Sequence, residues 1–464
     1  MSSIPSRRAQ VGLVASAIIH SSFAAAQPSS EPAPSAATAP SIATAPSAVP
    51  RSQATAVIAS ALGAASALSL RREHVVGDVY HESFRIPLAS GPNGAIGLHR
   101  ITREHASGWP KPSHGGVLLL HGDFSSFLGN FALGLADADA DGERSRPSLA
   151  IWLAERGFDV WGLDRRWALA PADGDLSDFD GMSFEQQVDD VAVALGIARG
   201  VRAVTGAGLG PLHLGGFSRG GFIAYAAAAA DAELPAPARQ VRSLVPLDIW
   251  AEIPPEDEAA RTFTCDSAAA ERDAVAQGFV DVNNSFFITL GELAPIAPDE
   301  PSPLDPGFTN RGLFLLTAAQ TYVFFPPTES YHLAAATLVD DVPSALSESS
   351  EDVIASWFAH AAPHQPMRES ADSDGMWCGD GSGPPGPDLS RIEVPLFYLG
   401  AAGGYGDHGI YSTTRVGSSD VTTRVIRRQP ASLVAADFGH ADLLFARDAP
   451  SLAWEPLAAW LRQH

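Results

Sequence analysis

The sequence predicts an α/β fold, in which helices flank a mostly parallel sheet and a largely helical cap is inserted between two late strands. Three observations predict it. Short apolar runs alternate with helical segments between residues 117 and 230, which is typical of a doubly wound sheet. A Gly-Phe-Ser-Arg-Gly sequence at 216–220 lies between one such run and a helix. Residues 250–390 lack this alternation of apolar runs and helical segments. They are too many for a structureless loop, which indicates a helical cap.

The elements follow in order along the chain. Residues 79–86 alternate polar and apolar side chains, as a half-buried strand does, and 96–101 pairs back across a Gly-Pro-Asn-Gly turn. Continuous apolar runs predict strands that are covered on both faces. These expected strands are 117–120, 158–163, 212–214, 244–247 and 395–399, with a further strand at 432–436, and the expected helices are 148–156, 184–198, 221–230 and a C-terminal helix that contains Trp454 and Trp460.

The N-terminus resembles an export signal. Arg7 and Arg8 precede an apolar stretch at 11–19, and the Ala-Ala-Ala at 24–26 matches a cleavage site. We therefore expect residues 1–26 to be a signal peptide, and the mature protein to be secreted or periplasmic. The chain would then divide into a Pro/Ala/Ser-rich linker with an Ala-rich segment (27–74), a first core part (75–249), the cap (250–390) and a second core part (391–464).

Composition limits the classes of function. The chain has 464 residues, of which 45% are hydrophobic, so it can bury a sizeable core. With 53 acidic and 30 basic residues its net charge is −23, which excludes nucleic acid as an expected partner. Two cysteines, Cys265 and Cys378, are too few for a zinc ribbon. Both lie in the cap, and in an exported protein we expect them to form a disulfide, with two separate buried thiols as the alternative.

An acidic loop at 137–142 matches the first half of a calcium-binding EF-hand loop. The position that should carry a bidentate glutamate is Ser148. We therefore interpret this stretch as a solvated loop, while calcium binding there stays open. No metal and no cofactor is expected.

The pentapeptide at 216–220 carries the candidate nucleophile, Ser218. At a sharp turn between a strand and a helix, a serine is held in a strained backbone conformation and its oxygen points out of the sheet. The backbone N–H groups of Arg219 and of Asp123, which follows the strand at 117–120, would form an oxyanion hole. The alternative interpretation is an unreactive Ser-Gly turn.

His440 is the candidate general base, because it lies in Phe-Gly-His-Ala-Asp near the C-terminus and so fits the chain order serine, acid, histidine. Two aspartates could orient it. We favour Asp407, which follows the strand at 395–399 in a glycine-rich loop. Asp248, directly after the strand at 244–247, is the alternative, since both loops leave the carboxyl ends of sheet strands.

With these residues in place, the chain resembles an α/β-hydrolase, and specifically the acid-lipase branch that includes gastric and lysosomal lipases. The matching pieces are Leu-His-Arg-Ile at 98–101, Leu-Leu-Leu-His-Gly at 118–122, the helix and strand at 148–161, the serine elbow, and residues 438–442. The resemblance implies an ester-hydrolysing enzyme with a lid. Phe217 and Arg219 replace the His and Gln usual around that family's serine, and Leu-Asp-Arg-Arg-Trp at 163–167 replaces its Asn-Ser-Arg-Gly, which leaves the lipid substrate open.

The sequence thus predicts a secreted serine hydrolase that cleaves carboxylic esters, a lipase or esterase. An amidase, a peptidase, a polyester depolymerase and a non-catalytic binding scaffold on the same fold are the alternatives. Phe217 and the cap residues Phe324 and Phe325 are expected to line the substrate. The expected partner is a small-molecule or lipid ester, with transient contact to a lipid surface. The acyl chain, the alcohol and the oligomeric state stay open.

Overall fold

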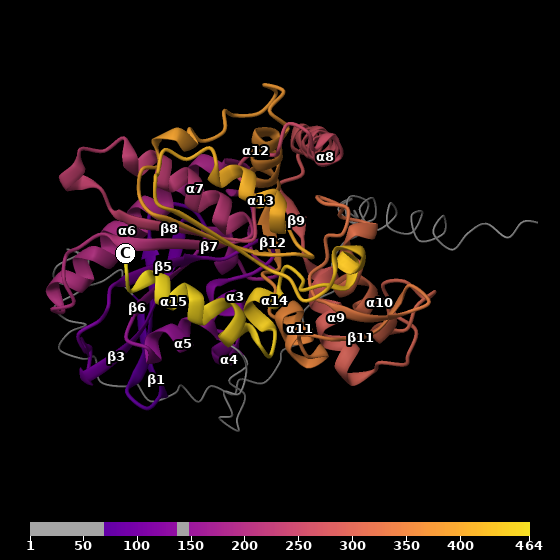
Figure 1. Ribbon diagram of the computed structural model, residues 1–464, viewed down its shortest axis with the longest axis horizontal. Helices are drawn as coiled ribbons and strands as arrows, with labels where there is room; N and C mark the ends of the chain where they lie inside the picture. Colours follow the sequence, from indigo (N-terminus) through magenta and orange to yellow (C-terminus); the bar gives the residue numbers. More distant parts are fainter. Residues whose placement is uncertain (1–68, 137–147) are drawn as a thin grey trace, which may run out of the picture.

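The computed structural model describes residues 69–136 and 148–464 (Figure 1). The expected signal peptide, most of the expected linker and the acidic loop at 137–142 lie outside the described residues. A 10-stranded sheet forms the centre, in the order β1-β2-β3-β6-β5-β7-β8-β13-β14, with β4 paired to β3. The strands from β6 to β14 along this order are parallel, and β1, β2 and β3 add an antiparallel edge. The predicted α/β class is confirmed.

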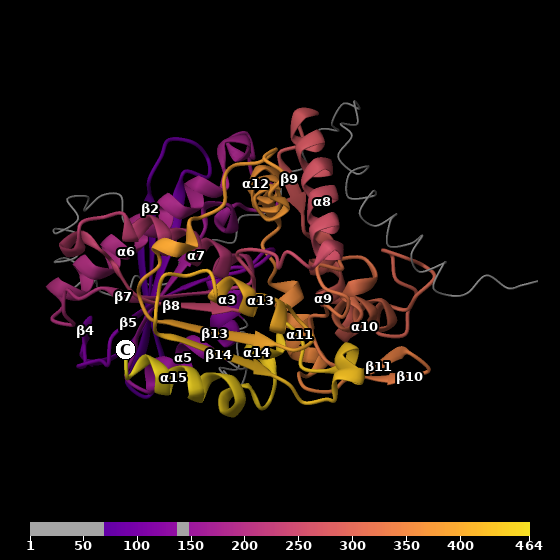
Figure 2. The same cartoon turned by 45° about the horizontal axis from the view of Figure 1, so that its top comes forward.

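The parallel strands other than the edge strand β14 are the apolar runs of the sequence, and they are buried because helices cover both faces of the sheet. β14 is mostly exposed and was not predicted from the sequence. Figure 2 shows α6 and α7 on one side of the sheet and α5 and α15 on the other. The strands are β1 (Ser69–Val76), β2 (Val79–Pro87), β3 (Ala95–Ala106), β4 (Trp109–Pro110), β5 (Gly116–Leu120), β6 (Asp159–Asp164), β7 (Leu212–Phe217), β8 (Val241–Leu247), β13 (Leu396–Ala401) and β14 (Val421–Ile426).

Two of the core helices, α3 and α6, begin after a serine whose side chain caps the first turn. The Ser183 side chain accepts a hydrogen bond from the Gln186 N–H at the start of α6, which satisfies one of the free donors of the first turn. The core helices are α3 (Phe127–Phe131), α4 (Leu133–Ala136), α5 (Leu149–Glu155), α6 (Phe184–Val204), α7 (Arg219–Ala232), α13 (Gly406–Thr413), α14 (Asp442–Phe445) and α15 (Glu455–Leu461). Short 3-10 or π turns are η1 (Arg166–Leu169), η2 (Phe179–Gly181), η3 (Ala236–Ala238), η5 (Leu389–Arg391), η6 (Ala431–Ala436) and η7 (Pro450–Trp454).

The cap connects β8 to β13, two neighbouring strands of the sheet, so it leaves and re-enters the core at adjacent points. It is largely helical, as predicted. Its elements are α8 (Glu258–Ala276), β9 (Asp281–Asn283), α9 (Ser285–Ile296), α10 (Asn310–Ala319), η4 (Thr321–Val323), β10 (Ala336–Val339), β11 (Val342–Leu346), α11 (Glu351–Ala359), β12 (His364–Pro366) and α12 (Met367–Cys378).

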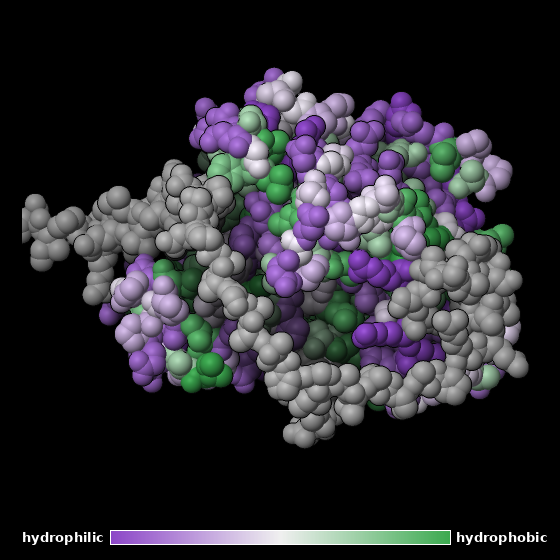
Figure 3. All heavy atoms as spheres, turned by 180° about the vertical axis from the view of Figure 1, so that it is seen from behind, coloured by the Kyte–Doolittle hydropathy of each residue, from purple (hydrophilic) through white to green (hydrophobic). Residues whose placement is uncertain are grey.

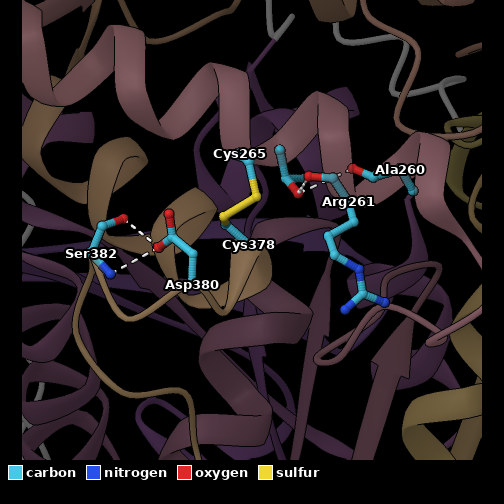
Figure 4. Close-up of a disulfide and its surroundings, with 7 residues drawn as sticks. Ala260, Arg261, Cys265, Cys378, Asp380 and Ser382 are labelled. Atoms are coloured by element: carbon cyan, nitrogen blue, oxygen red, sulfur yellow. Dashed lines mark hydrogen bonds between the residues drawn. A yellow bond between two sulfur atoms is a disulfide. The ribbon is translucent and has the colours of Figure 1, made fainter.

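A disulfide joins Cys265 and Cys378, as expected (Figure 4). Cys265 lies in α8 and Cys378 is the last residue of α12, so the bond ties the first helix of the cap to the last one. The two helices run against each other over their lengths (Figure 2). The bond closes a loop with a sequence separation of 113 residues, which spans most of the cap.

One predicted boundary and one predicted element differ in the structure. The folded part begins by Ser69 rather than near Val75, because β1 is an edge strand whose exposed, charged residues gave no apolar pattern. The stretch expected as a strand at 432–436 is the 3-10 helix η6, and it does not join the sheet. Leu433 is 53% exposed there, so this segment has no buried face of the kind that a sheet strand needs.

The face seen in Figure 3 is mostly hydrophilic where the described residues form it, in keeping with the acidic composition. From behind, hydrophobic side chains gather in a recess near the middle of the face (Figure 3). In residues 69–136 and 148–464, no helix has both the length and the apolar character that crossing a membrane requires.

Candidate active site

Ser218 occupies the turn between β7 and α7 with φ of 55° and ψ of −132°. A positive φ is uncommon for a residue with a side chain, and it costs free energy that the surrounding structure must offset. Here the Ser218 N–H donates to the Leu247 carbonyl at 3.0 Å, which anchors the turn to β8. The side chain is partly exposed at the N-terminus of α7. The predicted strand–turn–helix context of the serine is therefore confirmed.

The two glycines of the pentapeptide have steric reasons to be glycine. A Cβ atom on Gly216 would lie 2.2 Å from the Gly220 carbonyl oxygen, and a Cβ on Gly220 would lie 2.3 Å from the Leu120 carbonyl oxygen. Both are backbone atoms that cannot move aside. The turn can close, and α7 can pack against β5, only because these positions lack side chains.

The loop after β5 lies directly against the serine. A Cβ on Gly122 would be 3.0 Å from the Ser218 Cβ, so the backbone at 122 passes next to the nucleophile candidate. The Gly122 N–H donates to Asn130 Oδ1 at 2.8 Å, and the Phe124 N–H donates to Gln365 Oε1 at 3.1 Å. Among the described residues, no protein acceptor pairs with the N–H of Asp123 between them. A free N–H beside the serine is what an oxyanion hole requires.

The second expected donor is the Arg219 N–H. It belongs to the first residue of α7, and the first N–H groups of a helix have no acceptor within the helix. Both predicted backbone donors thus belong to segments next to Ser218, namely the loop after β5 and the start of α7.

The side chains of Asp123 and Arg219 form an ion pair with each other, so the expected oxyanion hole involves only their backbone N–H groups. Asp123 accepts from Arg219 Nε at 2.9 Å and from Gln365 Nε2 at 2.7 Å. Burial raises the pKa of Asp123, but Arg219 and Arg165 outweigh burial and hold the pKa below its usual value. Arg219 also donates to Asp374 of α12, at 3.3 Å. Burial raises the pKa of Asp374 to about 6, although the hydrogen bond from Arg219 lowers it.

His440 pairs with Asp248. The Nδ1 of His440 lies 2.7 Å from Asp248 Oδ2, and both side chains are buried, with 2% and 0% exposure. The carboxylate also accepts three backbone N–H groups, from Ala401 at 2.9 Å, Tyr405 at 3.1 Å and Gly406 at 2.8 Å. Four nitrogen atoms therefore surround one carboxylate and fix its orientation. An aspartate held in this way can fix which nitrogen of the imidazole carries the proton.

The prediction that Asp407 orients His440 is wrong. Asp407 lies in the first turn of α13, is 62% exposed and accepts from Arg427 Nη2 at 2.6 Å. The glycine-rich loop before Asp407 does not supply the acid but makes room for it. A Cβ on Gly404 would lie 1.9 Å from Asp248 Oδ2, so the carboxylate occupies the space that a side chain would fill. The alternative, Asp248, is the aspartate that the structure brings to His440.

Backbone strain is concentrated around this group of residues. Five described residues other than glycine have a positive φ, and three of them are Phe124 (42°), Ser218 (55°) and Asp248 (49°). The other two are consecutive aspartates in the tight turn between β10 and β11, where such angles are ordinary. Strained residues that persist outside hairpin turns mark places where the structure holds groups in a required position.

Phe217 lies against His440 rather than in an open substrate pocket. Its ring stacks on the imidazole with 4.3 Å between ring centroids, and it is 1% exposed. Since Phe217 directly precedes Ser218, this contact places the imidazole beside the serine turn. Tyr331 and Tyr405 approach the same imidazole, with centroid distances of 5.3 and 5.8 Å.

The cap holds the histidine loop through its backbone. The His440 N–H donates to the His332 carbonyl at 2.9 Å, and the Ala441 N–H donates to the Leu333 carbonyl at 2.7 Å. Asp442 accepts from the Gly439 N–H at 2.8 Å and the cap's Ala335 N–H at 2.8 Å. Burial raises the pKa of Asp442 to about 7, against the lowering effect of these hydrogen bonds.

The other two predicted substrate residues lie in the cap near Tyr331. Phe325 is 37% exposed, and its ring meets Phe263 at 5.3 Å and Tyr331 at 5.6 Å. Phe324 is half-buried beside it. Because Tyr331 touches both Phe325 and His440, aromatic rings lead from the histidine to the surface. By contrast, the apolar cluster that begins at Leu313 is buried in the cap core.

A second group of rings packs around Phe124, in the loop at 121–124. Phe124 stacks on Phe287 of α9 at 4.3 Å and meets Trp357 of α11 at 5.1 Å. A cavity of about 570 Å³ lies elsewhere, between α8, α12 and the start of α6, and includes neither Ser218 nor His440 in its lining.

Several residues around the site were not identified from the sequence. Gln365, Glu369 and Asp374 of the cap contact the loop at 121–124 or the residues that hold it, and Arg165 follows β6. The one available signal was Leu-Asp-Arg-Arg-Trp at 163–167, a charged run directly after a buried strand.

No protein-family model matches the chain, and no curated protein matches it. Solved structures do. A presumed lipase from Sulfolobus solfataricus superimposes with a TM-score of 0.59 at 17% identity, covering 86% of this chain and 99% of that one. A soluble variant of monoglyceride lipase from Saccharomyces cerevisiae gives 0.45 at 12% identity, with 86% and 96% coverage. An alpha/beta hydrolase fold protein from Nakamurella multipartita gives 0.36 at 13% identity, with 82% and 98% coverage.

At these identities the likeness concerns the fold. It agrees with what the chain itself displays, namely a mostly parallel sheet, a serine at the sharp turn after β7, and a cap between β8 and β13. The protein has the α/β-hydrolase fold.

Proposed function

We propose that the protein is a serine hydrolase that cleaves carboxylic esters. The observation that carries the proposal is the buried His440–Asp248 pair next to a strained serine at the start of a helix. A histidine with one nitrogen held by a carboxylate, beside a serine whose backbone is strained, is the arrangement that makes a hydroxyl nucleophilic.

In this proposal Ser218 Oγ attacks the ester carbonyl while Nε2 of His440 takes its proton. Asp248 keeps the other imidazole proton on Nδ1 and stabilises the imidazolium that forms. The N–H groups of Asp123 and Arg219 bind the oxyanion of the tetrahedral intermediate. His440 then gives the proton to the leaving alcohol, which leaves an acyl-enzyme on Ser218. Water attacks this acyl-enzyme while His440 takes a proton from the water, and His440 returns that proton to Ser218 Oγ as the carboxylic acid is released.

The aromatic rings that contact His440 and the loop at 121–124 favour an ester with an apolar acyl or alcohol group. The acid-lipase motifs of the sequence lead us to propose a lipase or esterase, and the solved lipase structures share the fold. We also propose that the protein is exported, since a disulfide persists in oxidising compartments. Phe324 and Phe325 are the residues proposed to contact the longer chain.

The test is a set of substrates and one inhibitor on the purified protein. A fluorescent alkyl phosphonate should label Ser218, identified by peptide mass, and the Ser218→Ala variant should not be labelled. p-Nitrophenyl esters from acetate to laurate should be hydrolysed, whereas p-nitroanilides of the same acids should be hydrolysed far more slowly. Ser183→Ala, which changes a helix cap away from the site, is the control. Labelling at another residue, or faster cleavage of anilides than of esters, would contradict the proposal.

A further inference from the structure

The amide that would bind the oxyanion belongs to the peptide group between Gly122 and Asp123. A peptide group is planar and trans, so its C=O and N–H point in opposite directions and cannot turn independently. Whatever fixes the Gly122 carbonyl therefore also aims the Asp123 N–H. This carbonyl does not join the sheet, because it follows the end of β5.

Two side chains donate to the Gly122 carbonyl. Arg165 Nη2 lies 2.7 Å from the oxygen, and His121 Nδ1 lies 2.9 Å from it. The histidine proton is assigned by its other nitrogen, since Nε2 accepts from the Arg165 N–H at 3.2 Å and so must be unprotonated. Burial, together with the charge of Arg165, lowers the pKa of His121 to about 3, so the ring is neutral.

Arg165 itself is held on its other side. Its Nη1 donates to Glu369 of α12, and its guanidinium lies over the Trp167 ring with 4.5 Å to the centroid. Trp167 Nε1 donates to the other oxygen of Glu369 at 2.9 Å. The arginine and the glutamate are both buried, with side-chain exposures of 2% and 0%. A planar guanidinium locked in this way presents its donor in one direction.

We propose that Arg165 is a positioning residue: through the Gly122 carbonyl it aims the Asp123 N–H at the oxyanion site beside Ser218, and Glu369 of the cap keeps it there. This inference rests on the proposed function. A cation at the carbonyl also polarises the peptide and makes its N–H a stronger donor. Its contribution falls on the transition state, because the charge on the oxygen develops only there.

The chain offers a matched control in the next residue. Arg166 forms a buried two-point ion pair with Asp190, at 2.7 Å for both contacts, and no described contact joins it to the loop at 121–124. The test compares Arg165→Met/Glu369→Gln with Arg166→Met/Asp190→Asn. Each double variant removes a buried ion pair without leaving a lone charge. Arg165→Lys is a milder third variant, because one ammonium group cannot reach both Glu369 and the carbonyl with the geometry of the fork.

The Arg165 double variant should lose roughly 10–100-fold in kcat on p-nitrophenyl butyrate, with KM changed less than about threefold, because a misaimed donor loses part of what a deleted donor loses. The rate of phosphonate labelling should fall by a similar factor. Arg165→Lys should lie between this variant and the wild type, and the Arg166 variant should stay within about threefold of the wild type. Equal losses in both pairs, or a loss confined to KM, would overturn the inference.

Crystal structures of the same variants provide a reading that does not depend on catalysis. The peptide between Gly122 and Asp123 should rotate in the Arg165 variants and stay in place in the Arg166 variant. If the wild type neither cleaves esters nor reacts with the phosphonate, the proposed function is refuted. Rotation of the peptide in the Arg165 variants would still show that Arg165 positions the Asp123 N–H. An unrotated peptide in both Arg165 variants would refute this positioning role.

Discussion

Replacing Asp248 with asparagine tests the assignment of the acid at the level of single hydrogen bonds. Oδ1 accepts from the Ala401 and Gly406 N–H groups, and Oδ2 accepts from the Tyr405 N–H and from His440 Nδ1. Asparagine has one acceptor oxygen and one NH₂ group. The oxygen should take the Oδ1 position, because the flipped amide would set its NH₂ against two backbone donors instead of one.

In that orientation the NH₂ group donates to His440 Nδ1, which moves the imidazole proton to Nε2. A protonated Nε2 cannot take the proton of Ser218, so Asp248→Asn should lose on the order of 10⁴ in kcat. This loss corresponds to about 5.4 kcal/mol of transition-state stabilisation, at about 1.36 kcal/mol per factor of ten. The Tyr405 N–H, left facing another donor, should cost about 1–3 kcal/mol of folding stability.

The assay is the kcat for p-nitrophenyl butyrate, with thermal melting followed by circular dichroism to confirm the fold. Asp407→Asn is the control, since Asp407 is 62% exposed and forms only a surface ion pair with Arg427. It should change kcat by less than about twofold. If Asp407→Asn loses more activity than Asp248→Asn, or if Asp248→Asn keeps more than a tenth of the wild-type kcat, the assignment of Asp248 is refuted.

Three further predictions concern the cap and its contacts. Cys265→Ser/Cys378→Ser should lower the free energy of unfolding by at most about 4.8 kcal/mol, from the chain-entropy relation applied to a separation of 113 residues, and more usually by about 2–4 kcal/mol; urea unfolding that matches the wild type would contradict this. Because burial raises the pKa of Asp442 to about 7 in the folded state, from about 3.9 unfolded, its contribution to stability should be present at low pH and be lost as the pH rises through that interval. The melting temperature of the wild type should therefore fall more steeply between pH 4 and pH 7 than that of Asp442→Asn, and parallel curves would exclude the effect. Phe325→Ser should slow hydrolysis of laurate esters more than of acetate esters, because each buried CH₂ of the acyl chain contributes roughly 0.8 kcal/mol; equal losses would mean that the ring only packs against Phe263 and Tyr331.

Much of the core could be predicted because the local sequence and the fold agree there. The apolar runs that become β5, β6, β7 and β8 are buried on both faces, so their pattern needs no knowledge of distant residues. The turn at Ser218 was identifiable for the same reason, since its glycines, its strand and its helix are neighbours in the sequence. The edge strand β1 lacks such a pattern, and its start was missed. The strand-like residues 432–436 were mispredicted as a strand, because this pattern does not show that the segment is an exposed 3-10 helix, η6.

The acid was mispredicted because two loops that are far apart in sequence meet in space. A glycine-rich loop followed by an aspartate indicates a flexible carrier of that aspartate. Here the same glycines make room for the carboxylate of Asp248, which arrives from the end of β8. Neither segment alone indicates which of them supplies the carboxylate and which makes room for it. The contacts of Arg165 with Gly122 and Glu369 were missed for the same reason, since they join three separate segments.

The cap's hydrogen bonds to both loops of the candidate site have a consequence for how the protein would respond to heating. Segments of the cap hold the His440 backbone through His332 and the loop at 121–124 through Gln365. Partial unfolding of the cap would therefore release both loops while the sheet beneath stays intact. Inactivation on heating should then precede the loss of the far-ultraviolet circular dichroism of the core. For the same reason, grafting a cap from another protein of this fold would have to preserve these backbone contacts as well as the shape of the substrate pocket.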